Sequence, residues 1–135
     1  MNLSFPFRKE KSPIFGYIYR PIAYVSFWSR RYKMWGEITV IVDTGADYTL
    51  LPYYLAEVFG IDLETEARPF STQGVGGKET VYVVPKHNVL LGAWERTIPV
   101  GFLERNTIPP VMGRHLFLET FETLFSKNQA VVFRA

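Results

Sequence analysis

Ile41-Val42-Asp43-Thr44-Gly45-Ala46-Asp47 is the stretch from which the organisation of this chain can be worked out. Residues 38–42 are mostly β-branched, a composition that favours a buried strand over a helix. Thr44 and Gly45 suit an abrupt turn after that strand, because Gly tolerates positive φ and lets backbone amides approach a carboxylate. The sequence therefore predicts that Asp43 is presented in a tight turn at a strand end. An ordinary turn without a function would have the same composition.

Two further stretches carry signals in a consistent order. Gln73-Gly74-Val75-Gly76-Gly77 predicts the glycine-rich tip of a hairpin, and Pro110-Val111-Met112-Gly113-Arg114 predicts a second apolar strand that ends before a helix. Together with the Asp43 turn, these stretches resemble the retropepsin family, the retroviral-type aspartic proteases. The family pattern is an Asp-Thr-Gly-Ala-Asp turn, a glycine-rich flap, and an apolar strand end with Gly-Arg that leads into a helix. The resemblance spans residues 17–133.

Size and composition fit one domain. The chain has 135 residues, of which 47% are hydrophobic and 16% aromatic, enough for one core but not for a second lobe. Residues 1–135 are expected to form a single retropepsin-like domain, with residues 1–16 as an N-terminal arm that is irregular over 1–13. Many short strands and one or two short helices favour a mostly β fold, a closed acid-protease barrel of the retropepsin type.

The remaining elements are predicted from local composition. Strand-like runs occur over residues 17–19, 22–28, 81–84, 89–91, 97–103, 123–125 and 130–133, and residues 69–92 predict a hairpin around the glycine-rich tip. Helical spacing occurs over residues 53–59, closed by Gly60, and over residues 114–122, the best helix candidate. Residues 61–66 are charged and predict a solvated connection or a surface strand.

Charge excludes several classes of partner. The net charge is +2 with both signs interspersed, so we expect neither nucleic acid nor a membrane as a partner. The basic run Arg30-Arg31-Tyr32-Lys33, flanked by Trp28 and Trp35, could bind single-stranded nucleic acid through stacking and phosphate contacts. A solvated hairpin tip explains the same run and is the preferred interpretation.

The chain has no cysteine and no apolar segment long enough to span a membrane, so we expect a cytoplasmic protein. His87 and His115 are far apart in the sequence, and a metal site is not expected. No cofactor is predicted.

The predicted chemistry needs two carboxylates. Hydrolysis of a peptide bond without a metal or covalent intermediate requires a base to activate water and an acid to protonate the carbonyl oxygen. Two carboxylates about 3 Å apart share one proton and meet that need. Asp43 is the only acid in an Asp-Thr-Gly setting, so the simplest pair is made by a two-fold homodimer with one Asp43 from each subunit.

The resemblance implies roles for further residues. Thr44 and Gly45 complete the catalytic turn, and the matching threonines of retropepsins interlock between subunits. Asp47 is expected to hold substrate backbone and to pair with Arg114, which with Gly113 supports the turn. Two separate surface charges are the alternative to that pair. Substrate-binding positions are Ile41, Ala46, Asp47, Leu50, Gly74, Val75, Gly76 and Val111, although most of the apolar ones could equally be plain core.

Two positions depart from the commoner patterns. Ala46 stands where pepsin-like enzymes usually carry Ser, which removes a hydroxyl donor to the carboxylate, so we expect an activity optimum at weaker acidity than that of pepsin. His115 stands where retropepsins usually carry Asp or Asn, and its role stays open.

The function predicted from the sequence is an aspartic endopeptidase acting on peptide or protein substrates. The alternative is a retropepsin-like module for peptide binding or dimerisation, with slow or no hydrolysis. A displaced flap or a weak dimer would give that outcome without changing any motif residue.

Overall fold

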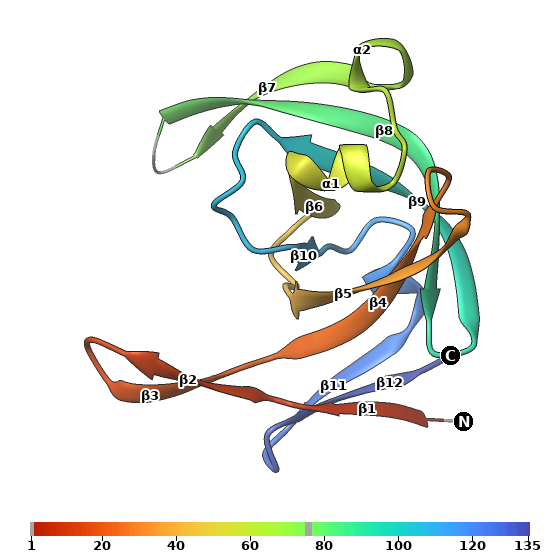
Figure 1. Ribbon diagram of the computed structural model, residues 1–135. Coiled ribbons are helices and arrows are strands. Elements are labelled where there is room, and N and C mark those ends of the chain that lie inside the picture. Colours follow the sequence, from red (N-terminus) through yellow and green to blue (C-terminus); the bar gives the residue numbers. More distant parts are fainter. Residues whose placement is uncertain (1, 75–76) are drawn as a thin grey trace.

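Short strands dominate the structure, a computed structural model that describes residues 2–74 and 77–135 (Figure 1). The strands are β1 (Asn2–Pro6), β2 (Arg8–Ser12), β3 (Gly16–Arg20), β4 (Ile22–Ser29), β5 (Met34–Val42), β6 (Thr49–Pro52), β7 (Arg68–Gly74), β8 (Gly77–Leu91), β9 (Trp94–Leu103), β10 (Val111–Met112), β11 (Glu122–Ser126) and β12 (Ala130–Arg134). The helices are α1 (Tyr54–Val58), α2 (Leu63–Glu66) and the 3₁₀ turn η1 (Leu118–Thr120).

A closed barrel forms the body of the molecule. Its sheet has the order β4-β5-β10-β6-β9-β8-β7, and an additional pairing of β4 with β8 closes it. The pairs β5–β10 and β6–β9 are parallel, whereas the other neighbours are antiparallel. The mostly β, closed barrel predicted from the sequence is confirmed. A homodimer remains a proposal.

The core fills the barrel from alternating positions of these strands. Ala23, Val25 and Phe27 of β4 are fully buried, as are Val100 and Phe102 of β9. Each large apolar side chain buried in this way stabilises the fold by about 1.5–3 kcal/mol. The wall of the barrel is therefore closely packed on its inner side.

Helix α1 confirms the helix predicted over 53–59. Gly60 follows it with a φ of +73°, and a Cβ at this position would lie 2.8 Å from the backbone nitrogen of Arg31. The basic run 30–33 forms the solvated tip between β4 and β5, as preferred from the sequence.

The N-terminal segment is regular, so the prediction of an irregular arm over 1–13 is wrong. Strand β1 pairs with β12 in a three-stranded sheet of order β1-β12-β11, and Phe5 is buried against Phe133 and Tyr24. Strand β2 pairs with β3. Residues 8–12 lack the alternation of apolar and polar residues by which a strand is predicted. A two-stranded ribbon with both faces exposed does not need that alternation.

The helix predicted over 114–122 is also wrong. Residues 114–117 form turns, and only Leu118–Thr120 is helical, in the 3₁₀ form. Leu116 has a φ of +58°, which an α-helix does not allow, and its N–H donates to Glu119 Oε1 at 3.0 Å. Packing overrides the helical pattern here, because the adjacent residues Phe117 and Leu118 are both buried.

One smaller expectation needs correction. Residues 61–66 contain a helix, α2, because the Asp62 carboxylate accepts from the N–H of Glu64 at 3.1 Å and caps it.

Pro99 lies inside β9, between β6 and β8. It is tolerated there because the β8–β9 register shifts between Val84 and His87, opposite this position.

Within residues 2–74 and 77–135, no helix has the length and apolar character needed to cross a membrane.

Candidate active site

The Asp43 turn follows β5 directly, as predicted. Strand β5 lies between β4 and β10, and Asp43, Thr44 and Gly45 are exposed at its end. The N–H of Gly45 donates to Asp43 Oδ1 at 2.9 Å, and the N–H of Ala46 donates to the Asp43 carbonyl at 3.2 Å. A Cβ at position 45 would lie only 3.2 Å from Oδ1, so the absence of a side chain permits this close approach.

The turn is clamped by the segment that follows β10. The N–H of Asp43 donates to the Met112 carbonyl at 3.1 Å. In return, the N–H of Arg114 donates to the Ala46 carbonyl at 2.9 Å and that of His115 to the Asp47 carbonyl at 2.7 Å. All three bonds use backbone groups, so the Asp43 carboxylate is held in place without being consumed by a neighbouring side chain.

Gly113 is required by this clamp. A Cβ there would overlap the backbone of Tyr48, and the Gly113 N–H donates to Thr49 Oγ1 at 3.2 Å. Thr49 is buried, with 1% of its surface exposed. Sequence reasoning missed Thr49, although a hydroxyl at an inward strand position two residues after Asp47 was the available signal.

Asp47 and Arg114 form the ion pair predicted from the resemblance, with Arg114 Nη2 2.8 Å from Asp47 Oδ1. The side chains are 52% exposed for Arg114 and 80% for Asp47, so the pair orients these groups and adds little to stability. Beside it, burial and the negative charge of Asp47 raise the pKa of the Tyr48 hydroxyl above its ordinary value. Tyr48 therefore stays a neutral hydrogen-bonding group.

An open pocket of about 420 Å³ adjoins the ion pair, lined by Asp47, Tyr48, Val83, Pro99, Arg114, His115 and Glu119. His115 Nδ1 lies 3.6 Å from Glu119 Oε1 in this lining. The pocket thus combines an apolar floor with charges of both signs beside the turn.

Three of the predicted apolar positions come together. Val111 of β10 is the registered neighbour of Ile41 on β5 and of Leu50 on β6. All three side chains are half-buried, so they form a continuous apolar row that still has surface available to a ligand.

The predicted flap residues lie partly outside the described residues. Strands β7 and β8 form the expected hairpin, and their pairing extends to Gly74 and Gly77. Val75 and Gly76 fall outside the residues that the structure describes.

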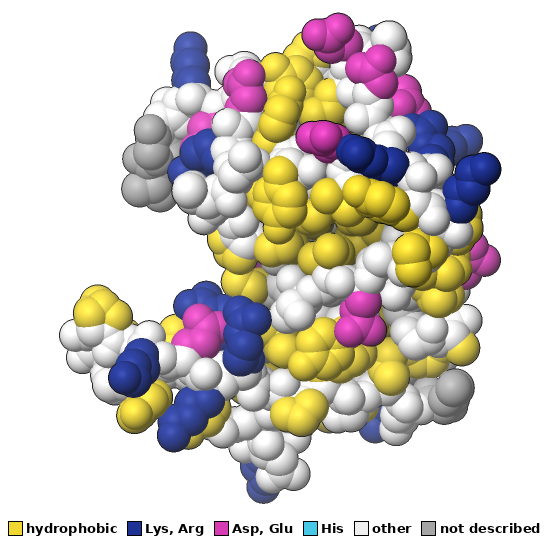
Figure 2. Space-filling model, in the orientation of Figure 1, with side chains coloured by type: hydrophobic (Ala, Val, Ile, Leu, Met, Phe, Trp, Pro, Cys, Tyr) yellow, Lys and Arg dark blue, Asp and Glu magenta, His cyan; other side chains and the backbone are white. Residues whose placement is uncertain are grey.

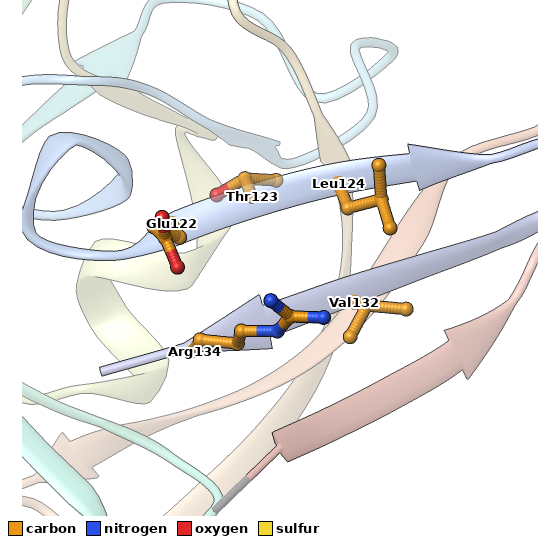
Figure 3. Close-up of a pocket in the computed structure, with 5 residues that line it drawn as sticks. All are labelled: Glu122, Thr123, Leu124, Val132 and Arg134. Carbon is orange, nitrogen blue, oxygen red and sulfur yellow. The ribbon is translucent and has the colours of Figure 1, made fainter.

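Another cavity lies on a different sheet. It has a volume of about 300 Å³ and is lined by Glu122, Thr123, Leu124, Val132 and Arg134 of β11 and β12 (Figure 3). Leu124 and Val132 form its apolar part, and the charged groups of Glu122 and Arg134 lie toward one end (Figure 3). It is therefore not part of the Asp43 site. In the part of the chain that the structure describes, no group of three or more His, Asp or Glu side chains could hold a metal ion.

Comparison with known proteins agrees with this geometry. Residues 36–116, more than half of the chain, match the family model described as aspartyl protease. The chain belongs to the aspartyl protease family. Its fold is similar to that in the crystal structure of a retropepsin-like aspartic protease from Rickettsia conorii, with a TM-score of 0.68 over 98% of each chain at 16% sequence identity. No curated protein matches the chain by sequence.

The matched segment contains the whole clamp. It begins inside β5 and ends just after Arg114, so it includes the Asp43 turn, Thr49 and Gly113. Family membership and fold are those of a peptidase.

Proposed function

We propose that this aspartyl protease family member is an endopeptidase in which two copies of the chain each contribute Asp43 to one active site. The observation that carries the proposal is the Asp43 carboxylate itself, which is exposed at a strand end and held through backbone bonds. An exposed carboxylate that is held by backbone groups stays accessible to a substrate, as the proposed chemistry requires.

The chain's other aspartates support the need for a second copy. Asp47 is paired with Arg114, and Asp62 caps helix α2. Neither follows the Asp-Thr-Gly pattern. A homodimer supplies the missing carboxylate by symmetry, and two acids about 3 Å apart then share one proton.

In the proposed mechanism, the ionised Asp43 of one subunit takes a proton from water while the protonated Asp43 of the other donates to the scissile carbonyl oxygen. The roles then reverse as the leaving amine is protonated. The Gly45 amide fixes Oδ1 of Asp43. The proposed role of Thr44 is to interlock the two turns across the axis. The pair titrates as a unit.

The proposed substrate is an extended peptide with apolar residues beside the cleaved bond. The half-buried row of Ile41, Val111 and Leu50 would receive its side chains, and Asp47 would hold its backbone. Figure 2 shows a hollow between the β7–β8 hairpin and the hairpin formed by β2 and β3. The hollow lies on the side of the molecule where β5 ends in Figure 1. We propose that the β7–β8 hairpin, with Gly74, Val75 and Gly76, acts as the flap over this hollow.

The test replaces Asp43 by Asn. We expect Asp43→Asn to lower peptide cleavage by about 10³-fold or more, because the pair loses its acid and base. Sedimentation should show an unchanged dimer. Asp62→Asn is the matched control and should cut at the wild-type rate, since Asn also caps helices.

Mixing the two chains tests whether they share one site. If each site needs both carboxylates, an equal mixture of wild-type and Asp43→Asn chains should retain about one quarter of the activity of the same amount of wild-type protein. Retention of about one half would mean that each chain works alone. Either that result or a fully active Asp43→Asn variant would overturn the proposal.

A further inference from the structure

Residues 8–20 form a hairpin that stands away from the barrel, called here the protruding hairpin (Figure 1). Its strands β2 and β3 pair only with each other, from Arg8 opposite Arg20 to Ser12 opposite Gly16. An isolated two-stranded ribbon has little stability of its own in water. A persistent ribbon of this kind is therefore a candidate for packing against something else.

The tip of the protruding hairpin is apolar and uncovered. Ile14 is 79% exposed and Phe15 is 76% exposed, and Tyr17 and Tyr19 are also exposed. Exposed large apolar side chains grouped in one place indicate an interaction surface. Figure 2 shows them beside a concentration of basic side chains on the same element.

The protruding hairpin is rooted next to the Asp43 turn. Pro21, which connects β3 to β4, accepts a hydrogen bond from the N–H of Val42 at 3.0 Å, and Val42 immediately precedes Asp43. The other stem is braced where the N–H of Phe7 donates to the Gln129 carbonyl at 2.7 Å. Any assembly that brings two Asp43 turns together therefore brings the roots of both hairpins together.

The protruding hairpin points toward the position that a second subunit would occupy in a dimer with the two Asp43 turns together. In Figure 1 it projects on the side where β5 ends and reaches farther out than the loop after β5. Its five-residue strands span about 17 Å. With Asp43 on the two-fold axis, a hairpin of that reach passes into the space of the other subunit.

A receiving surface exists at the same end of the molecule. The sheet of β1, β12 and β11 lies beside the root of the protruding hairpin in the lower part of Figure 1. Its strand β11 exposes Leu124 and Phe125, and the 300 Å³ cavity in Figure 3 opens between β11 and β12. That volume admits one aromatic side chain. In a two-fold dimer each such contact is made twice.

Charge does not oppose a second copy as the occupant. Residues 8–20 contain four cations and one anion, Arg8, Lys9, Lys11 and Arg20 against Glu10, a net charge of +3. On the receiving surface Glu122 and Arg134 cancel, so the cationic hairpin meets a cavity lining with no net charge. The position of the hairpin root beside the Asp43 turn is therefore what favours a second copy.

We propose that the protruding hairpin clasps the second subunit, its Ile14–Phe15 tip packing on the partner's β11–β12 surface at Leu124. The inference rests on the proposed homodimer and names the element that holds it together. The clasp and the catalytic pair are separate features, so each has its own test.

The first experiment is a cross-linking test that uses the absence of cysteine from the chain. We mix a chain that carries Phe15→Cys with a chain that carries Leu124→Cys and treat the mixture with a short bismaleimide. The two chains have tags of different mass, so that a mixed dimer can be recognised. A mixed cross-linked dimer is the expected product. The matched control pairs Tyr32→Cys with Leu124→Cys, because Tyr32 is an exposed aromatic residue at another hairpin tip and should give no such product.

The second experiment measures dimer affinity by sedimentation. The double variant Ile14→Ser with Phe15→Ser should raise the dimer Kd at least tenfold, with an unchanged circular dichroism spectrum. The control, Tyr32→Ser with Met34→Ser, removes equally exposed apolar groups at the β4–β5 tip and should leave Kd unchanged.

The outcomes separate the two proposals. A dimer that cleaves peptides but gives no Phe15–Leu124 cross-link, or whose Kd is unaffected by the tip variant, overturns the clasp alone. A monomer at all concentrations overturns the proposed function and the clasp with it. Cross-linking of two Phe15→Cys chains to each other would place the tips at the axis and overturn the β11–β12 surface as the receiver.

Discussion

The two ends of β5 carry turns that are held in opposite ways. At the start, charged side chains tie the turn to the helical region, with Arg30 bonded to Glu66 at 2.7 Å and Arg31 to Glu57 at 3.1 Å. At the other end, backbone amides hold the turn and the Asp43 carboxylate is left exposed. Both turns carry an exposed ion pair, but at the Asp43 end one carboxylate is held by a backbone amide and stays available for the proposed chemistry.

Gly113 should show how tightly the Asp43 end of β5 is packed. Gly113→Ala is expected to lower the free energy of unfolding by about 2–4 kcal/mol, because the new Cβ overlaps the Tyr48 backbone. Gly36→Ala, on β5 near its other end, is the control. Its Cβ would lie 3.8 Å from the Phe27 carbonyl oxygen, an ordinary contact, so the change should stay within about 0.5 kcal/mol. Urea unfolding measures both, and equal effects would contradict the close packing.

A buried hydroxyl supports the turn at each end of β5, Thr49 at the Asp43 end and Ser29 at the other. Replacing each hydroxyl in turn should distinguish an effect on stability from an effect on activity. Thr49→Val leaves the Gly113 N–H unpaired, and Ser29→Ala removes a bond of 2.8 Å to the Val58 carbonyl. Each should cost about 1–2 kcal/mol in the free energy of unfolding. Only Thr49→Val should also lower kcat/KM, since it loosens the clamp on Asp43. An equal loss of activity in Ser29→Ala, measured well below the unfolding transition, would remove the distinction.

His87 makes the structural end sensitive to acid. Burial lowers its pKa, and its ring packs beside Phe27 and Phe59. The Trp28 carbonyl and Glu66 act in the opposite direction, whereas Arg30 lowers the pKa further. The unfolded chain therefore binds the proton more readily than the folded chain does.

The free energy of unfolding should accordingly fall as the pH drops below about 6.5, the ordinary value for His, and this loss should level off below the folded pKa. The slope from this group is at most about 1.4 kcal/mol per pH unit. Urea unfolding across this range should show a shallower slope in His87→Gln than in the wild type. An identical slope in the variant and the wild type would contradict the assignment.

The smallest expected effect on stability compares two equally exposed ion pairs. Arg114–Asp47 has side chains 52% and 80% exposed, and Arg31–Glu57 has 49% and 81%. Arg114→Lys and Arg31→Lys should each change the free energy of unfolding by less than about 0.5 kcal/mol. Arg114→Lys alone should raise KM, because Lys orients Asp47 less precisely for substrate backbone. A raised KM in Arg31→Lys as well would show that the effect does not depend on the position of Arg114 beside Asp47.

The Asp43 end of β5 was predictable because several local signals agree there. The β-branched strand, the turn residues and the glycine before Arg114 each have a preference that the fold satisfies. The apolar row of Ile41, Leu50 and Val111 followed from the family resemblance, and the barrel then placed the three in register.

The remainder depended on contacts that local composition does not encode. Residues 114–122 have a helical pattern, but burial of Phe117 and Leu118 and the positive φ of Leu116 replace the helix by turns. Residues 8–12 have no strand pattern, yet they pair with residues 16–20. Thr49 escaped notice because its partner, the Gly113 amide, is 64 residues away in the chain.

The hydrogen bonds from Gly45, Ala46 and Arg114 that hold the Asp43 turn form within a single chain, and this has a consequence for timing. Under the proposed function, every newly made chain already carries a finished half of the site, and assembly is a meeting of two prepared halves with no refolding. Dilute enzyme would then lose activity with the square of its concentration. The amount of protein present would act as its own switch, keeping the enzyme idle while it is scarce and active once it accumulates.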